Sequence, residues 1–103
     1  MTDAEISKAL AIAIGWTPEQ IRPDGDAVAV HAAQPWPGLD WPTFDYRNTD
    51  VIWPIAEQYN SFPIRSEDGS WSVCTGVDYA DTYFADTAAK AVAIAVIEQE
   101  KQK

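Results

Sequence analysis

Seven consecutive apolar residues, 91–97, lie near the end of the chain. Asp86 and Thr87 precede them as candidate N-caps, so the sequence predicts a helix from Ala88 to about Glu100. This helix is apolar almost all round and must be deeply packed, and its alanines permit close approach of a sheet.

Two more helices are predicted from capping residues and apolar spacing. Thr2 and Glu5 form a capping box ahead of apolar residues at helical spacing, which predicts a helix over residues 2–14. Another helix begins near Asn48, and residues 17–20 predict one short helical turn.

Strand signals fall in three places. Residues 27–33 read as a strand after a turn, residues 62–76 as a hairpin, and residues 82–85 as a short third strand. A two-residue turn at Asp68 and Gly69 would close the hairpin. The side chains then expected on its buried side are Phe62, Ile64, Trp71 and Val73.

Together these elements predict a single α+β domain over residues 1–103. We expect a small antiparallel sheet of about three to four strands with helices packed on both faces, an α/β/α sandwich. Cys74 is the sole cysteine, which excludes a disulfide framework, and with no secretion signal it favours the cytoplasm. The apolar runs are too short to span a bilayer.

Charge restricts the partners. Sixteen acidic and seven basic residues give a net charge of -9, which disfavours direct binding to nucleic acid or to an anionic membrane. The acidity either keeps the protein soluble or addresses a basic surface on a host or phage protein. The candidate acidic partner-binding residues are Glu67, Asp68, Asp78, Asp81 and Asp86, in a segment without a base.

No residue is assigned a catalytic role. His31 is the sole histidine and lies in a predicted strand, and Cys74 is expected to face away from Trp71 with no cation beside it. The five glycines form no phosphate-binding motif, so no cofactor is expected.

No metal site is assigned either. Asp24 and Asp26 resemble the start of a calcium loop, but Val28 and Pro35 stand where later ligands belong. Capping and solvation explain the acids of residues 78–86 as well as a hard cation would.

Residues 34–47 form a Pro-rich arm that contains three prolines and four aromatic residues. Its aromatic side chains either fold back onto the body or form an exposed interface, since Trp and Tyr dominate protein-binding hot spots. The candidate interface residues are Trp36, Trp41, Phe44 and Tyr46.

Four short motifs occur in a characteristic order: Gly15-Trp16, residues 48–50 followed by Trp53, residues 69–73, and residues 85–91 leading into the Ala-rich helix. This order resembles the phage ABA-sandwich domain family, small proteins encoded by phages and prophages. The resemblance covers nearly the whole chain and implies helices on both faces of a small antiparallel sheet. It implies no activity, cofactor or catalytic residues.

Three functions remain open at this point. The leading hypothesis is a non-enzymatic phage accessory protein that binds a protein partner, as an acidic inhibitor of a host antiviral defence complex. The second is a structural or assembly protein whose Pro-rich arm joins two copies as a homodimer. The third is a small-ligand or nucleotide-binding module, for which Arg22 and Arg47 are the cations near the arm.

Overall fold

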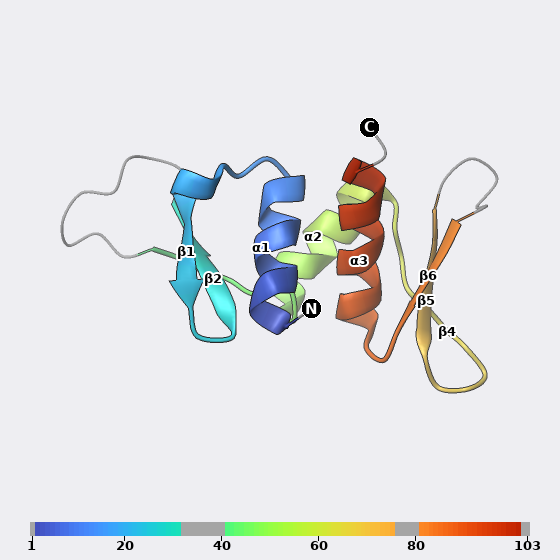
Figure 1. The fold of residues 1–103 in the computed structure, drawn as a ribbon. Coiled ribbons are helices and arrows are strands. Elements are labelled where there is room, and N and C mark those ends of the chain that lie inside the picture. The colour runs from blue at the N-terminus through green and yellow to red at the C-terminus, as the bar shows by residue number, and fades with distance from the viewer. Residues whose placement is uncertain (1, 32–40, 76–80, 102–103) are drawn as a thin grey trace.

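The computed structural model describes residues 2–31, 41–75 and 81–101 (Figure 1). The helices and strands, in chain order, are α1 (Asp3–Ala13), the 3-10 turn η1 (Pro18–Gln20), β1 (Ile21–Asp24), β2 (Ala27–Val30), β3 (Thr43–Phe44), α2 (Thr49–Tyr59), β4 (Ile64–Arg65), β5 (Trp71–Thr75), β6 (Asp81–Ala85) and α3 (Ala88–Lys101).

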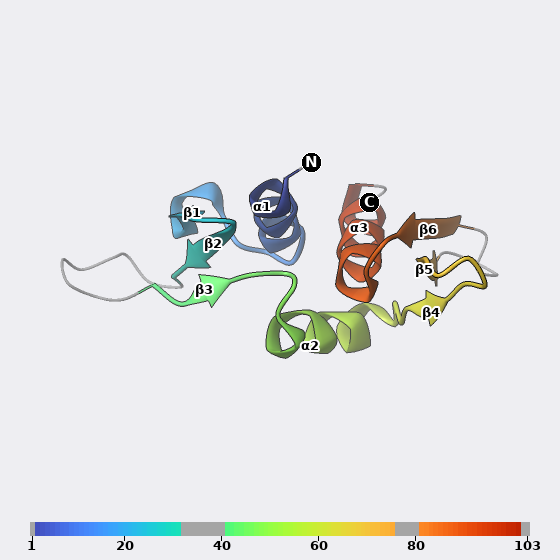
Figure 2. The same ribbon diagram turned by 90° about the horizontal axis from the view of Figure 1, so that it is seen from below.

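Two antiparallel sheets lie on either side of a helical layer. The N-terminal sheet has the order β1-β2-β3, and the C-terminal sheet has the order β4-β5-β6. Figures 1 and 2 show α1 and α3 side by side between the two sheets, and Figure 2 shows α2 crossing below them. The α+β class is therefore confirmed, but the helices lie between two sheets rather than on both faces of one.

Helix α3 is the centre of this arrangement. It contacts α1, α2, β5 and β6, and six residues of its apolar run are buried. Ala91, Ala93 and Ala95 have no exposed surface, so their small side chains let the neighbouring elements approach closely. The expectation of a deeply packed C-terminal helix is confirmed.

None of the described helices is long and apolar enough to cross a membrane.

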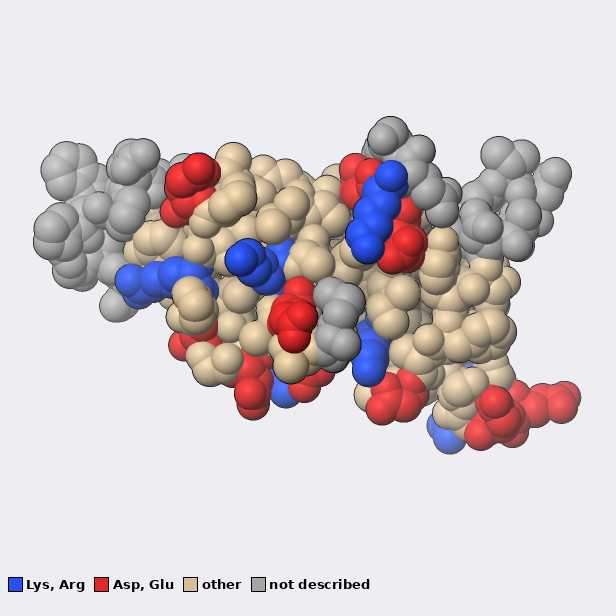
Figure 3. Space-filling model, viewed as in Figure 1, with Lys and Arg blue, Asp and Glu red and all other residues tan. Residues whose placement is uncertain are grey.

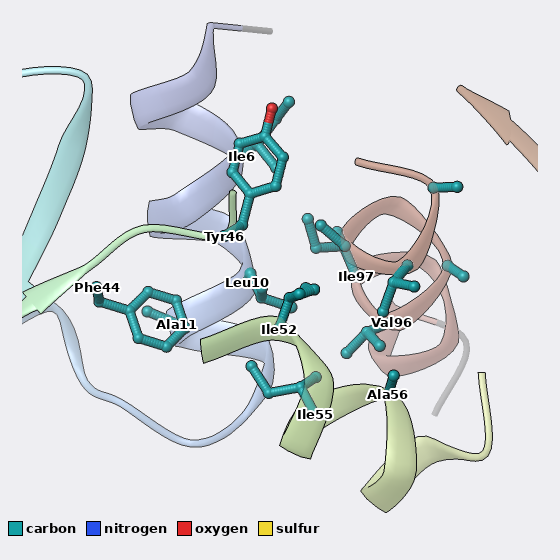
Figure 4. Packing of buried hydrophobic residues seen from close by; sticks show 14 of the residues in the cluster. Ile6, Leu10, Ala11, Phe44, Tyr46, Ile52, Ile55, Ala56, Val96 and Ile97 are labelled. Carbon is teal, nitrogen blue, oxygen red and sulfur yellow. The ribbon is translucent and has the colours of Figure 1, made fainter. Parts of the chain in front are cut away.

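A single cluster of buried side chains joins the three helices to both sheets. In Figure 4, Leu10 of α1 and Ile52 of α2 point toward Val96 and Ile97 of α3. Leu10 is completely buried, whereas Ile12, two residues further along α1, is 44% exposed.

Local capping explains where α1 begins and ends. Thr2 and Glu5 form the predicted capping box, with each side chain accepting a hydrogen bond from the other residue's backbone N–H at 3.2 Å. At the other end, Gly15 has a φ of +116°, which glycine adopts without strain. The N–H of Trp16 then reaches back to the carbonyl of Ala11 at 3.0 Å and closes the helix.

The N-terminal sheet contains two strands that the sequence did not predict. Strand β1 carries Pro23, and proline is confined to sheet edges because it lacks an N–H. Strand β3 has two residues and lies within the Pro-rich arm. Strand β1 lacks the apolar alternation that marks a strand and β3 is too short to show one, so both are defined by their pairing with β2.

The β4–β5 hairpin has a three-residue loop, residues 67–69, instead of the predicted two-residue turn. The N–H of Ser66 donates to the carbonyl of Ser70 at 2.8 Å, and the N–H of Gly69 donates to the carbonyl of Ser66 at 3.0 Å. Gly69 has a φ of +89°, as hairpin loops of this length require at their last position.

The extra loop residue turns the side chains of β4 to the opposite face of the hairpin from the one predicted. Ile64 pairs with Ser72, and Arg65 pairs with Trp71, so Ile64 lies on the side opposite Trp71 and Val73. The prediction that Phe62 and Ile64 share the buried side is wrong, because Ile64 is 61% exposed while Val73 is fully buried.

We expect Leu10→Ala to lower the free energy of unfolding by about 2 to 5 kcal/mol, because it leaves a cavity between the three helices. Ile12→Ala removes a similar volume from an exposed position of the same helix and should cost about 1 kcal/mol or less. Urea unfolding followed by circular dichroism measures both. Equal losses would show that α1 does not pack as described.

Candidate protein-binding surface

Two of the predicted acidic residues, Glu67 and Asp68, are exposed in the β4–β5 loop. The Asp68 carboxylate accepts hydrogen bonds from the Ser70 hydroxyl at 2.7 Å and from the Ser70 N–H at 3.0 Å. These bonds lower the pKa of Asp68 below its ordinary value, so Asp68 keeps its charge under mildly acidic conditions. Within the described ranges, neither acid has a Lys or Arg nitrogen within 4.0 Å.

Asp86 lies at the same end of the C-terminal sheet as this loop. It directly follows Ala85, which pairs with Trp71, the first residue of β5 after the loop. The Asp86 side chain is 80% exposed, and its carboxylate is 4.0 Å from the Nζ of Lys90, which lies four residues later in the first turn of α3. Glu67, Asp68 and Asp86 are called the acidic end below.

The other two predicted acids do not join the acidic end. Asp81 pairs with Thr75 at the opposite end of β6, four residues and about 13 Å from Ala85. Asp78 lies outside the described residues. The structure therefore brings together three of the five acids on which the sequence analysis relied.

Two cations moderate the charge of the acidic end. Arg65 lies beside the loop, with its guanidinium 5.8 Å from the centre of the Trp71 ring, and Lys90 is paired with Asp86. Three acids and two bases leave a local charge of -1. Figure 3 shows acidic side chains gathered at the lower right, next to the C-terminal sheet, with basic atoms beside them.

Trp41 is the one Trp of the Pro-rich arm that the structure describes, since Trp36 lies outside the described residues. The Arg22 guanidinium lies 4.6 Å from the Trp41 ring centre, and the His31 ring lies 5.7 Å away. Arg22 thus engages one surface on which a nucleotide base would stack. Arg47, the other cation considered for a phosphate, pairs with Asp45 at 2.8 Å.

Phe44 and Tyr46 are core residues, so their assignment to an aromatic interface is wrong. They are 7% and 2% exposed and belong to the central cluster. The backbone N–H of Tyr46 donates to the buried Ser7 hydroxyl at 3.1 Å. This bond and strand β3 bring the second half of the arm back onto the body of the protein, which is one of the two alternatives that the sequence left open for its aromatic residues.

The Tyr46 hydroxyl donates a hydrogen bond to the Asp3 carboxylate at the start of α1. Arg47 completes this polar group, with one guanidinium nitrogen 3.3 Å from Asp3 and another 2.8 Å from Asp45. Burial and the Asp3 carboxylate raise the pKa of Tyr46 well above its ordinary value. Hydrogen bonds from Arg47 lower the pKa of Asp45. The group fixes residues 45–47 to α1.

His31 and Cys74 belong to opposite ends of the molecule. His31 follows β2 of the N-terminal sheet, and Cys74 lies in β5 of the C-terminal sheet, beyond the helical layer (Figure 1). The Cys74 sulfur is 3.6 Å from the Thr82 hydroxyl on the neighbouring strand.

Asp24, from the calcium-like segment, accepts a hydrogen bond from Thr43 at 2.9 Å. In the described part of the chain, no three His, Cys, Asp or Glu residues gather as metal ligands.

A set of exposed apolar residues around the C-terminal sheet was not predicted from the sequence. Five large apolar side chains are exposed among the described residues, and four of them come from α2, β4, β6 and the segment before β4. Those four are Trp53 (49% exposed), Phe62 (42%), Ile64 (61%) and Phe84 (63%). A three-residue loop ending in Gly69 would have placed Ile64 on the outer side, so the sequence contained part of the signal.

Comparisons of the chain with protein-family models, curated proteins and solved structures returned no match. The candidate surface therefore rests on the geometry described above.

We expect Tyr46→Phe to lower the free energy of unfolding by about 1 to 3 kcal/mol near neutral pH, because a hydrogen bond to a charged group is lost. The pKa of Tyr46 is raised in the folded state, so its contribution is complete below the ordinary value of 10.0 and falls as pH rises above it. Above that pH, the free energy of unfolding should therefore fall less steeply with rising pH in the variant than in the wild type. Urea unfolding at several pH values measures the slope, and identical slopes would contradict the bond.

Proposed function

We propose that this chain is a non-enzymatic phage-encoded accessory protein that acts in the cytoplasm of the host cell by binding another protein. The observation that supports it is the surplus of negative charge, -9 over 103 residues, on a small α+β body. The resemblance to the phage ABA-sandwich domain family supports the phage setting. The separation of His31 from Cys74 removes the pair considered for nucleophilic chemistry.

The described cations are largely engaged within the chain. Arg47, Lys90 and Lys101 form ion pairs, and Arg22 and Arg65 lie over the rings of Trp41 and Trp71. Exposed acids such as Glu67 have no such partner among the described residues. The charge available to another molecule is therefore mainly negative, and a partner with a basic surface would be attracted to it.

We further propose that the partner is a complex of the host's antiviral defence that holds nucleic acid in a basic channel. An acidic domain at such a channel competes with the phosphate backbone for the same Lys and Arg side chains. The protein would then inhibit the complex by occupying the channel, without any chemical reaction.

Salt dependence and paired charge variants test the proposal. The tagged protein should capture its partner from a bacterial lysate at about 0.1 M salt and much less at about 1 M, where the Debye length falls from about 10 Å to about 3 Å. Glu67→Gln with Asp86→Asn should weaken capture, because both changes lie at the acidic end. Asp68 is left in place because it holds the loop.

Glu19→Gln with Asp26→Asn is the matched control, since it removes the same charge from exposed positions near the N-terminal sheet. We expect the control to retain most of the capture. Equal loss in both variants would assign the effect to total charge, and capture that is insensitive to salt and to both variants would overturn an electrostatic contact.

A further inference from the structure

The outer face of the C-terminal sheet is the side turned away from α3. Ile64, Ser72 and Phe84 stand directly opposite one another on β4, β5 and β6, so their side chains form one row on the same face. The inner face holds Val73, which is fully buried, and Trp71, which packs against the central cluster. The outer row therefore carries two large apolar side chains that α3 does not cover.

Ser72 lies between these two large side chains and is itself 9% exposed. Its hydroxyl donates to the carbonyl of Ile64 at 3.4 Å, so it needs no partner from outside. Ser72 is therefore already covered, whereas Ile64 and Phe84 on either side of it are 61% and 63% exposed.

The apolar surface continues from the sheet to α2. Trp53 and Phe62 meet edge to face, with ring centres 5.8 Å apart, which joins the exposed side of α2 to the start of β4. A hollow of about 390 Å³ lies beside this face and is lined by Asn60, Phe62, Ile64 and Cys74. Another hollow, of about 420 Å³, lies between α1 and α3, away from this face. We call Trp53, Phe62, Ile64, Cys74 and Phe84 the outer apolar face.

Four of the five exposed large apolar side chains in the described residues belong to the outer apolar face. Scattered exposed apolar residues are ordinary, whereas a contiguous set marks an interaction site. Trp is also one of the residue types that contribute most binding energy at protein interfaces, and Phe is enriched in them. This concentration is what a docking surface needs.

The segment that supplies the outer apolar face is rich in acidic residues. Between Asn48 and Thr87, the segment that supplies the whole face, the sequence has seven acidic residues and one basic residue. That base is Arg65, which stands opposite Trp71 on the inner side of the sheet. Glu57, one helical turn after Trp53, and Glu67 in the loop are both exposed.

An apolar surface in an acidic segment favours some kinds of binding partner over others. A second copy would bring another net charge of -9 against the first, and an anionic membrane or a nucleic acid would be repelled in the same way. A protein segment with apolar residues on one side and Lys or Arg on the other satisfies both features.

We propose that the outer apolar face docks a basic amphipathic segment of the partner protein. The inference rests on the proposed function, and it adds where the partner's apolar residues bind. Apolar side chains of the segment occupy the hollow beside Ile64 and pack against the exposed ring of Phe84. Its cations meet Glu57 on α2 and Glu67 in the β4–β5 loop.

A defined probe tests this without knowledge of the partner. The probe is a synthetic peptide of about four helical turns with Leu on one side and Lys on the other, and a matched peptide carries Ser in place of every Leu. Titration of the isotope-labelled full chain with the Leu/Lys peptide should move amide NMR signals of β4, β5, β6 and the Trp53 side of α2. The Ser/Lys peptide should cause little change.

Variants locate the contact. Phe84→Ser should weaken binding of the Leu/Lys peptide about tenfold or more, the effect of removing a central interface residue. Ile12→Ser is the matched control, because Ile12 is an exposed apolar residue of α1, outside the outer apolar face, and it should bind as the wild type does. The NMR spectra of both variants report whether the fold is retained.

Several results would overturn the docking site: signal changes confined to other surfaces, equal binding of the Leu and Ser peptides, equal effects of the two variants, or no binding at all. Concentration-dependent dimers in light scattering that disappear in Phe84→Ser would assign the face to a second copy instead. These results leave the capture experiment at the acidic end unaffected, so failure of the docking site and failure of the proposed function can be told apart.

Discussion

The burial of an almost uniformly apolar helix is the constraint on which this structure depends. An α3 without polar residues over 91–97 has no side that water can solvate well, so it needs neighbours in several directions. Helices α1 and α2 cover part of it, and β5 and β6 cover another part. Its fully buried alanines keep these neighbours close, which holds the C-terminal sheet against the helical layer.

Local signals in the sequence predicted the helices well. The capping box at Thr2, the apolar spacing that follows it and the run at 91–97 each act within a few residues of the chain. The sheets depend on pairing between distant segments, which such signals do not describe. Strand β3 and the position of Tyr46 follow from contacts with β2 and with Ser7, residues far away in sequence.

The candidate surface was predictable only in part, for the same reason. The turn predicted at Asp68 and Gly69 placed acidic residues in a hairpin loop, and Glu67 and Asp68 lie exposed there. Whether Ile64 faces the core or the solvent depends on one residue of loop length at Gly69, and both lengths suit the sequence. Phe44 and Tyr46 showed the opposite error, since proline-rich surroundings suggested exposure where α1 provides burial.

The division of the six described strands between two sheets has a consequence for self-association. In the described part of the chain each sheet ends in open edges, and three of the four edge strands are poor templates: β3 and β4 have two residues each, and β1 carries Pro23. Strand β6 is the exception, with five residues and no proline. Asp86 follows it directly and is 80% exposed, so a negative charge beside this edge opposes the stacking of identical edges into fibrils.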